Sequence, residues 1–251
     1  MRPVELAFQV LELIGRRQPV GVSEISRLAD LPKSTAQRTL KALAATGWIT
    51  LGDDALWSLT TRAMVACGRA TRPQAVLRGI ALPVLEDLRR ATGETIHLTW
   101  RDKDQLVLLE RLDGLKPVRY FFPLGGLVPL HVAASGHAVL AALSEGELES
   151  SLLRPMARFT PMTITEPDLL RGAIEVARSN GFAVSAGGNI ADVAAVGAAI
   201  VDPAGHPVAA ISVSAPVERL PSSTADEYGP QVADAARRIS LGLRAHHTSR
   251  P

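Results

Sequence analysis

Apolar stripes alternate with turn residues at the start of the chain, in a pattern that predicts three helices. Over residues 3–17 the apolar side chains recur every three or four positions, which is the spacing of one helix face. Ser23 is a suitable N-cap for a second short helix, and the turn at residues 30–32 leads into a third. The third helix is expected over residues 32–46, with three side chains turned inward: Ala36, Leu40 and Leu43.

The segment that follows the third helix predicts a two-stranded hairpin. Residues 48–51 form a short apolar strand, Gly52 opens a turn, and residues 55–59 form the return strand. Two helices joined by a tight turn over residues 21–40, followed by such a hairpin, make a winged helix-turn-helix. We expect this DNA-binding domain to occupy residues 1–60.

The rest of the chain predicts a linker and a larger domain of mixed α+β class. Residues 61–77 are compatible with a linker helix but are interrupted by Gly68 and Pro73. Over residues 78–251, stretches with strand alternation and stretches with helical spacing follow one another. The expected strands cover residues 95–100, 105–112, 118–122, 181–185, 193–202 and 207–215. The expected helices cover residues 77–92, 135–143, 167–179 and 223–245.

The composition excludes several classes of protein. A hydrophobic fraction of 47% and a charged fraction of 21% are typical of a globular chain and not of a disordered one. The single cysteine, Cys67, cannot form an internal disulfide, and without a CxxC pair no zinc site, other metal site or cofactor is expected. We expect the reducing cytoplasm as its compartment. No apolar run approaches the roughly 20 residues of a membrane helix, so no membrane contact is expected.

The charge of the third helix points to nucleic acid, although the net charge of the chain is only +2. No acidic residue lies between Asp30 and Asp53, whereas three basic residues do. In a major groove Gln can pair with adenine and Arg with guanine, while Lys and Ser can hold phosphates. We therefore expect double-stranded DNA as a partner, with the wing on phosphates. The candidate DNA contacts are Arg27, Lys33, Ser34, Thr35, Gln37, Arg38 and Lys41.

Other interpretations of these features are open. A basic helix face is usually only solvated, and for an isolated helix that interpretation would be favoured. The preceding helix, the turn and the wing shift the balance toward DNA. A helix-turn-helix could also serve protein contacts, which would not weaken with salt as DNA binding does. An enzyme is the third alternative, but the chain has no GxSxG elbow, Walker A loop or HExxH motif, so no catalytic residue is expected.

A series of short motifs resembles the IclR-type transcriptional regulators. Residues 31–40, Leu-Pro-Lys-Ser-Thr-Ala-Gln-Arg-Thr-Leu, followed by Gly47-Trp48-Ile49, are similar to the recognition helix and the first wing strand of that family. Further matching motifs are Pro129-Leu130-His131, Ser135-Gly136-His137-Ala138, Thr160-Pro161-Met162-Thr163, Asn180-Gly181-Phe182-Ala183 and the stretch 209–216. Each motif is weak, but their order and spacing hold over nearly the whole chain.

The resemblance implies a C-terminal effector-binding and oligomerisation domain built on a GAF-like antiparallel sheet flanked by helices. It also implies homodimers or dimers of dimers on a pseudopalindromic operator, repression more often than activation, and a small organic acid as effector. Backbone amides and polar side chains between the sheet and a loop hold the effector in this family. The matching positions here are Ala134, Ser135, Gly136, Ser185, Ala195, Ser212 and Ser214.

The candidate effector residues also have an ordinary interpretation, and some depart from the family pattern. A Ser-x-Ser pair on one strand can donate to a carboxylate, but two strand serines can equally satisfy buried hydrogen bonds. Ala195 and Ser185 stand where some family members have a cysteine and an acidic residue. His137 replaces a usual lysine, and Ala199 a common proline. The departures leave the fold expectation unchanged and the identity of the effector open.

Overall fold

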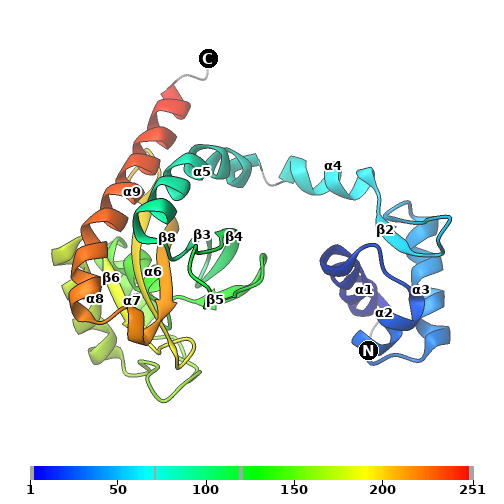
Figure 1. Cartoon of the computed structure of the whole chain (residues 1–251), viewed down its shortest axis with the longest axis horizontal. Helices are drawn as coiled ribbons and strands as arrows, with labels where there is room; N and C mark the ends of the chain where they lie inside the picture. Colours follow the sequence, from blue (N-terminus) through cyan, green and yellow to red (C-terminus); the bar gives the residue numbers. More distant parts are fainter. Residues whose placement is uncertain (1–2, 71, 119–120, 249–251) are drawn as a thin grey trace. The chain divides into compact units, whose positions relative to one another are not determined.

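The computed structural model describes residues 3–70, 72–118 and 121–248. It divides the chain into two units, Met1–Arg72 and Pro73–Pro251, and each is described by itself (Figure 1). No helix within the described ranges is long and apolar enough to cross a lipid bilayer.

The N-terminal unit contains three helices and a hairpin, as predicted. They are α1 (Pro3–Arg17), α2 (Val22–Leu28), α3 (Lys33–Ala45), β1 (Ile49–Leu51) and β2 (Trp57–Leu59), and α4 (Thr61–Ala70) follows them. The two strands pair antiparallel. Ile14, Ile25 and Leu40, one from each of the first three helices, are fully buried in a common core. The winged helix-turn-helix is therefore confirmed, because the apolar stripes of the three helices do face one another.

The turn between α2 and α3 is fixed by local geometry. Asp30 has a φ of 50°, in the left-handed region that Asp tolerates better than most residues. The Ser26 hydroxyl donates a 2.6 Å hydrogen bond to the carbonyl of Leu31. Pro32 follows as the residue before α3 and has no amide with which to continue a helix. These contacts set the angle at which α3 leaves α2.

The C-terminal unit is built on a six-stranded antiparallel sheet with the strand order β5-β4-β3-β8-β7-β6. Its strands are β3 (Thr95–Asp102), β4 (Gln105–Leu112), β5 (Leu127–Pro129), β6 (Ala183–Ala186), β7 (Val193–Val201) and β8 (Pro207–Pro216). Its helices are α5 (Arg72–Thr92), α6 (Ala134–Ala141), α7 (Glu145–Leu152), α8 (Pro167–Asn180), the 3-10 turn Val217–Arg219 and α9 (Ser222–Thr248). The predicted antiparallel sheet flanked by helices is thus confirmed.

The two faces of the sheet carry different layers. Leu85 of α5 and Val232 of α9 share a core with Ile211 on the central strand β8. Leu140 of α6 belongs to a second core with Ala210, the next residue on β8. Because successive strand side chains point to opposite faces, α5 and α9 cover one face and α6 lies over the other. The alternation also directs Ser212 and Ser214 to the α6 face.

Three details of the sequence prediction are wrong. α2 is preceded by Gly21 without a side-chain cap, and Ser23 lies inside the helix. No strand includes the described part of residues 118–122, while residues 119 and 120 lie outside the described ranges; β5 forms later, at Leu127–Pro129. Arginine side chains bind the carbonyls of two described residues here: Arg219 donates to Val118 O and Arg111 donates to Phe122 O. Helix α7, capped by Ser144, was not predicted.

Candidate DNA-binding helix and effector cavity

The outward face of α3 is polar and basic. Ala36, Leu40 and Leu43 are buried, whereas the other face leaves Lys33, Ser34, Gln37, Arg38 and Lys41 exposed. Thr35 is half-buried on the same helix, and Arg27 is exposed in the last turn of α2. Within the described residues no acidic side chain pairs with any of the four basic ones. Their charge therefore remains available to a polyanion.

The start of α3 is itself suited to an anion. The first turn contains no acidic side chain, and Pro32 supplies no side-chain cap for its amides. Uncapped amides at a helix N-terminus carry a partial positive charge that attracts phosphates. Lys33 and Ser34 lie in this turn, so side chains and backbone act in the same direction.

The distribution of charge distinguishes the two units. Residues 1–72 contain ten Lys and Arg against six Asp and Glu, a net charge of +4, whereas residues 73–251 contain 17 against 19, a net charge of −2. The wing is an exception within the basic unit, because Asp53 and Asp54 are exposed at its tip. The Asp54 carboxylate accepts a 3.0 Å hydrogen bond from the amide of Leu56 and so shapes the turn. The tip offers no cation to a phosphate.

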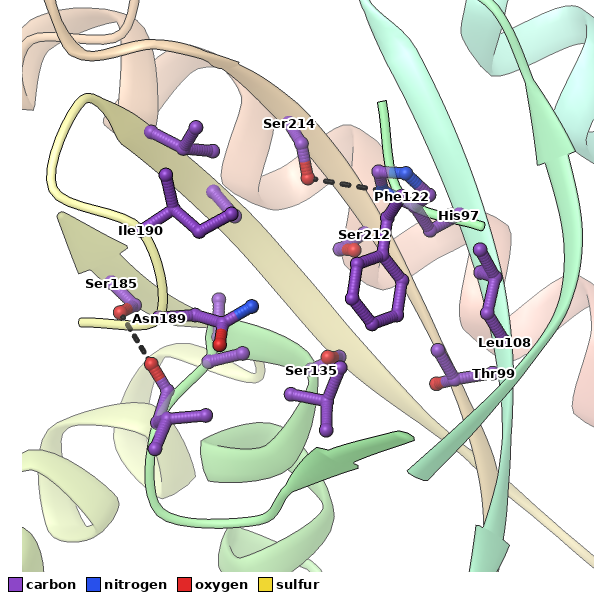
Figure 2. A pocket seen from close by; sticks show the side chains of 16 residues that line it. His97, Thr99, Leu108, Phe122, Ser135, Ser185, Asn189, Ile190, Ser212 and Ser214 are labelled. Atoms are coloured by element: carbon purple, nitrogen blue, oxygen red, sulfur yellow. Dashed lines mark hydrogen bonds between the residues drawn. The ribbon is translucent and has the colours of Figure 1, made fainter. Parts of the chain in front are cut away.

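A cavity of about 60 Å³ lies between the sheet and the first turn of α6 (Figure 2). Six of the seven candidate effector residues line it: Ala134, Ser135, Ser185, Ala195, Ser212 and Ser214. Gly136 is not among its described lining residues. A Cβ at that position would lie 2.1 Å from the carbonyl oxygen of Leu130, so Gly136 permits a close approach of two backbones.

Strand register explains how residues distant in sequence meet at the cavity. Ser185 on β6 lies opposite Ala195 on β7, which in turn lies opposite Ser214 on β8. Ser212 lies between Gly197 on β7 and a histidine on β3. A Cβ at Gly197 would come within 2.7 Å of the amide nitrogen of Ser135, so the glycine lets α6 approach the sheet. The start of α6 is thereby held beside the two serines of β8.

Two of the cavity hydroxyls have no hydrogen bond to the described residues. Ser135 and Ser212 are only 6% and 5% exposed. Buried hydroxyl groups normally have a partner, because an unpaired one costs free energy. Both line the cavity, so a ligand there could supply the missing partner.

His97 also lines the cavity and was not among the predicted site residues, although alternation along the predicted strand 95–100 places its side chain on the face opposite Ile96 and Leu98. The Nδ1 atom of His97 lies 3.2 Å from the Ser214 hydroxyl oxygen (Figure 2). Burial lowers the pKa of His97 to about 4, with the positive charge of Arg111 acting in the same direction and Asp113 opposing it. The imidazole is therefore neutral at physiological pH. Asn189 and Phe122, which also line the cavity, lie on loops where no periodicity could indicate them.

The lining described here contains no charged side chain. Arg111, whose positive charge lowers the pKa of His97, is not among these lining residues and has other partners. Its guanidinium donates to Asp113 at 2.7 Å and to the Phe122 carbonyl at 2.7 Å, and it lies 3.9 Å from the ring centre of Phe121. Arg111 thus holds the backbone beside Phe122, a cavity residue. Among the described residues no group of three His, Cys, Asp or Glu side chains could hold a metal ion.

Sequence comparison relates both units to known proteins. Residues 3–51 match the model of the IclR helix-turn-helix domain, and residues 72–241 match that of the bacterial transcriptional regulator IclR C-terminal domain. The HTH-type transcriptional repressor AllR of Escherichia coli K12 is 35% identical over 228 residues, which cover 90% of this chain and 84% of AllR. AllR of Salmonella typhimurium is 33% identical over 88% of this chain and 82% of its own length.

Solved structures agree with the sequence matches. The IclR structure of Thermotoga maritima has a TM-score of 0.79 at 29% identity, covering 96% of this chain and 98% of that one. An IclR homologue of Microbacterium hydrocarbonoxydans, solved in complex with 4-hydroxybenzoate, has a TM-score of 0.76 at 27% identity and covers 97% of this chain and all of its own. The fold, the two family matches and the AllR relatives together establish that this chain belongs to the IclR family of bacterial transcriptional regulators.

Proposed function

We propose that this regulator represses transcription by binding a pseudopalindromic operator as a homodimer or a dimer of dimers. The observation that carries the DNA contact is the outward face of α3, with four unpaired cations in the motif and an uncapped helix start. Gln37 and Arg38 read base edges, while Arg27, Lys33 and Lys41 hold phosphates, together with Ser34 and Thr35. Because a bacterial transcriptional regulator must reach the chromosome, the proposed compartment is the cytoplasm.

The proposed effector is a small organic acid with a single negative charge. Its carboxylate is held by the amides at the start of α6 and by the hydroxyls of Ser135, Ser212 and Ser214. A second charge is disfavoured because the described lining holds no countercharge, and an unpaired buried charge is costly. The Microbacterium relative in complex with 4-hydroxybenzoate supports an organic acid as ligand of this fold. A cavity of about 60 Å³ is smaller than the roughly 300–1,000 Å³ of drug-sized sites, which favours a compact acid.

The effector acts on DNA affinity through the segment between the two domains. We assign DNA binding to residues 1–60, the linker helix to residues 61–77, and effector binding and oligomerisation to residues 78–251. A ligand changes operator affinity only if it binds the two poses of the DNA-binding domains with different affinity. The coupling is reciprocal, so the operator must change the affinity for the acid by the same factor.

Sequencing of genomic fragments retained by the purified protein tests the proposal. We expect enrichment of one pseudopalindromic motif upstream of a small set of genes, and release of that DNA by one monocarboxylate among a panel. Retention without any enriched motif would contradict sequence-specific repression. Release by dicarboxylates alone would contradict the proposed effector charge.

A further inference from the structure

The motif Thr160-Pro161-Met162-Thr163 has no part in the contacts proposed above, yet its two threonines form a hydrogen-bonded hub. Thr163 is 3% exposed, and its hydroxyl accepts hydrogen bonds from the amides of Phe159 at 3.0 Å and Thr160 at 2.8 Å. The Thr160 hydroxyl accepts from the amide of Met162 at 3.0 Å. The loop is therefore tied together by its own side chains.

Both threonines donate their hydroxyl protons to another segment, 25 and 27 residues farther along the chain. Thr160 Oγ1 donates to the carbonyl of Gly187 at 2.6 Å, and Thr163 Oγ1 donates to the carbonyl of Gly188 at 2.7 Å. Two consecutive carbonyls of one turn are thus held by two side chains of one rigid loop.

The turn held in this way forms a wall of the effector cavity. Gly187 has a φ of 74°, and a Cβ at Gly188 would lie 2.5 Å from the carbonyl oxygen of Val132, itself a lining residue. Asn189 and Ile190 follow directly and line the cavity (Figure 2). A shift of the turn would move these side chains, and close packing against Val132 leaves it little room.

We propose that Thr160 and Thr163 are positioning residues, which hold the 187–190 turn and so set the affinity for the effector without touching it. The inference rests on the proposed effector function of the cavity. Neither threonine is among the described lining residues, so its hydroxyl acts only through the turn. Removing the Thr163 hydroxyl leaves two amides and one carbonyl without their partner, whereas Ser at this position retains it.

Amide hydrogen exchange of the full-length protein tests the clamp without any ligand. Within the turn the amide of Gly187 donates to Val193 O at 2.8 Å, and the amide of Val193 donates to Ile190 O at 3.1 Å. We expect exchange of these two amides to be about tenfold faster or more in Thr163→Val, with wild-type rates in Thr163→Ser. Thr165→Val is the matched control, because that hydroxyl accepts from Arg158 and does not contact the turn.

A second measurement tests the link to affinity, with acetate and benzoate as probes titrated into operator complexes. Thr163→Val should require about tenfold more acid for release, while its operator affinity without acid and that of Thr165→Val remain at the wild-type value. Unchanged exchange in Thr163→Val would overturn the clamp. Faster exchange with unchanged release would overturn its role in affinity. If neither acid bound the wild type while exchange still rose in Thr163→Val, the proposed effector chemistry would fail and the clamp would stand.

Discussion

The serines of β8 differ in what they already bind. Ser214 lies within hydrogen-bond distance of His97, whereas Ser212 has no hydrogen bond to the described residues. A carboxylate in the cavity would give both hydroxyls a charged acceptor, and such hydrogen bonds contribute about 1.5–3 kcal/mol each.

The double variant Ser212→Ala with Ser214→Ala should therefore need at least about tenfold more acid for release of the operator. Loss of one such hydrogen bond is enough to produce this change. Operator affinity without acid should remain unchanged. Electrophoretic mobility shifts with and without the acid measure both, with Ser150→Ala on the exposed face of α7 as control. Loss of DNA binding in the double variant would count against separate sites for DNA and for the effector.

His97 links the stability of the C-terminal unit to pH. Its pKa falls from an ordinary 6.5 to about 4 in the folded chain, so protons bind the unfolded chain preferentially. Protonation of His97 therefore does not reduce the free energy of unfolding above pH 6.5. As the pH falls toward 4, it lowers that free energy by about 3 kcal/mol in all. Burial lowers the pKa of His137 as well, so its effect has the same sign.

Urea unfolding at about pH 7 and about pH 4.5 measures this linkage. The wild type should lose about 2–3 kcal/mol more free energy of unfolding than His97→Gln between the two pH values. His247→Gln, an exposed imidazole in the last turn of α9, should behave like the wild type. Equal losses in wild type and His97→Gln would show that His97 is not buried as described.

Among the secondary-structure elements, the wing departs most from its expected role. An acidic tip repels phosphates, so we expect the wing to contribute little to DNA affinity and α3 to make the contacts that read the sequence. Asp53→Asn should raise affinity for any duplex by about two- to fivefold at low salt, because it removes one repulsion at close range. Asp226→Asn, the same change in the other unit, should have no effect. A loss of affinity in Asp53→Asn would mean that the carboxylate contacts DNA favourably.

Periodicity accounts for what the sequence predicted correctly. Alternation along β8 placed Ser212 and Ser214 on one face, and helical spacing separated the buried and exposed faces of α3. Features without a period were missed. The cavity residue Asn189 directly follows Gly188, whose carbonyl accepts a hydrogen bond from Thr163, 25 residues away, and the carbonyl of Phe122 accepts one from Arg111. The apolar run at 118–122 resembled a strand, but the carbonyls of Val118 and Phe122 accept hydrogen bonds from arginine side chains.

For the whole molecule, the proposed dimer predicts a fixed operator geometry. Two copies of α3 in successive major grooves on one side of the duplex require half-sites about 10–10.5 base pairs apart, or a multiple of that spacing. Inserting five base pairs between them turns one half-site to the opposite side. We expect operator affinity to fall to that of a single half-site. Insertion of ten base pairs should restore the affinity if the two DNA-binding domains of the dimer can span the longer distance. Equal affinity for all three spacings in mobility-shift titrations would contradict symmetric dimer binding.

The proposed DNA contact depends on the cations of α3 and on Arg27 of α2, so operator affinity should depend steeply on salt. Arg27, Lys33 and Lys41 of a dimer offer six phosphate contacts, so affinity should fall about a thousandfold between about 50 and 200 mM salt. Arg38→Ala should weaken operator binding by about 1–3 kcal/mol, and more than it weakens binding to random DNA. Arg244→Ala, exposed on α9, should match the wild type. An affinity independent of salt, or an Arg38→Ala variant with wild-type affinity, would show that these side chains do not bind DNA.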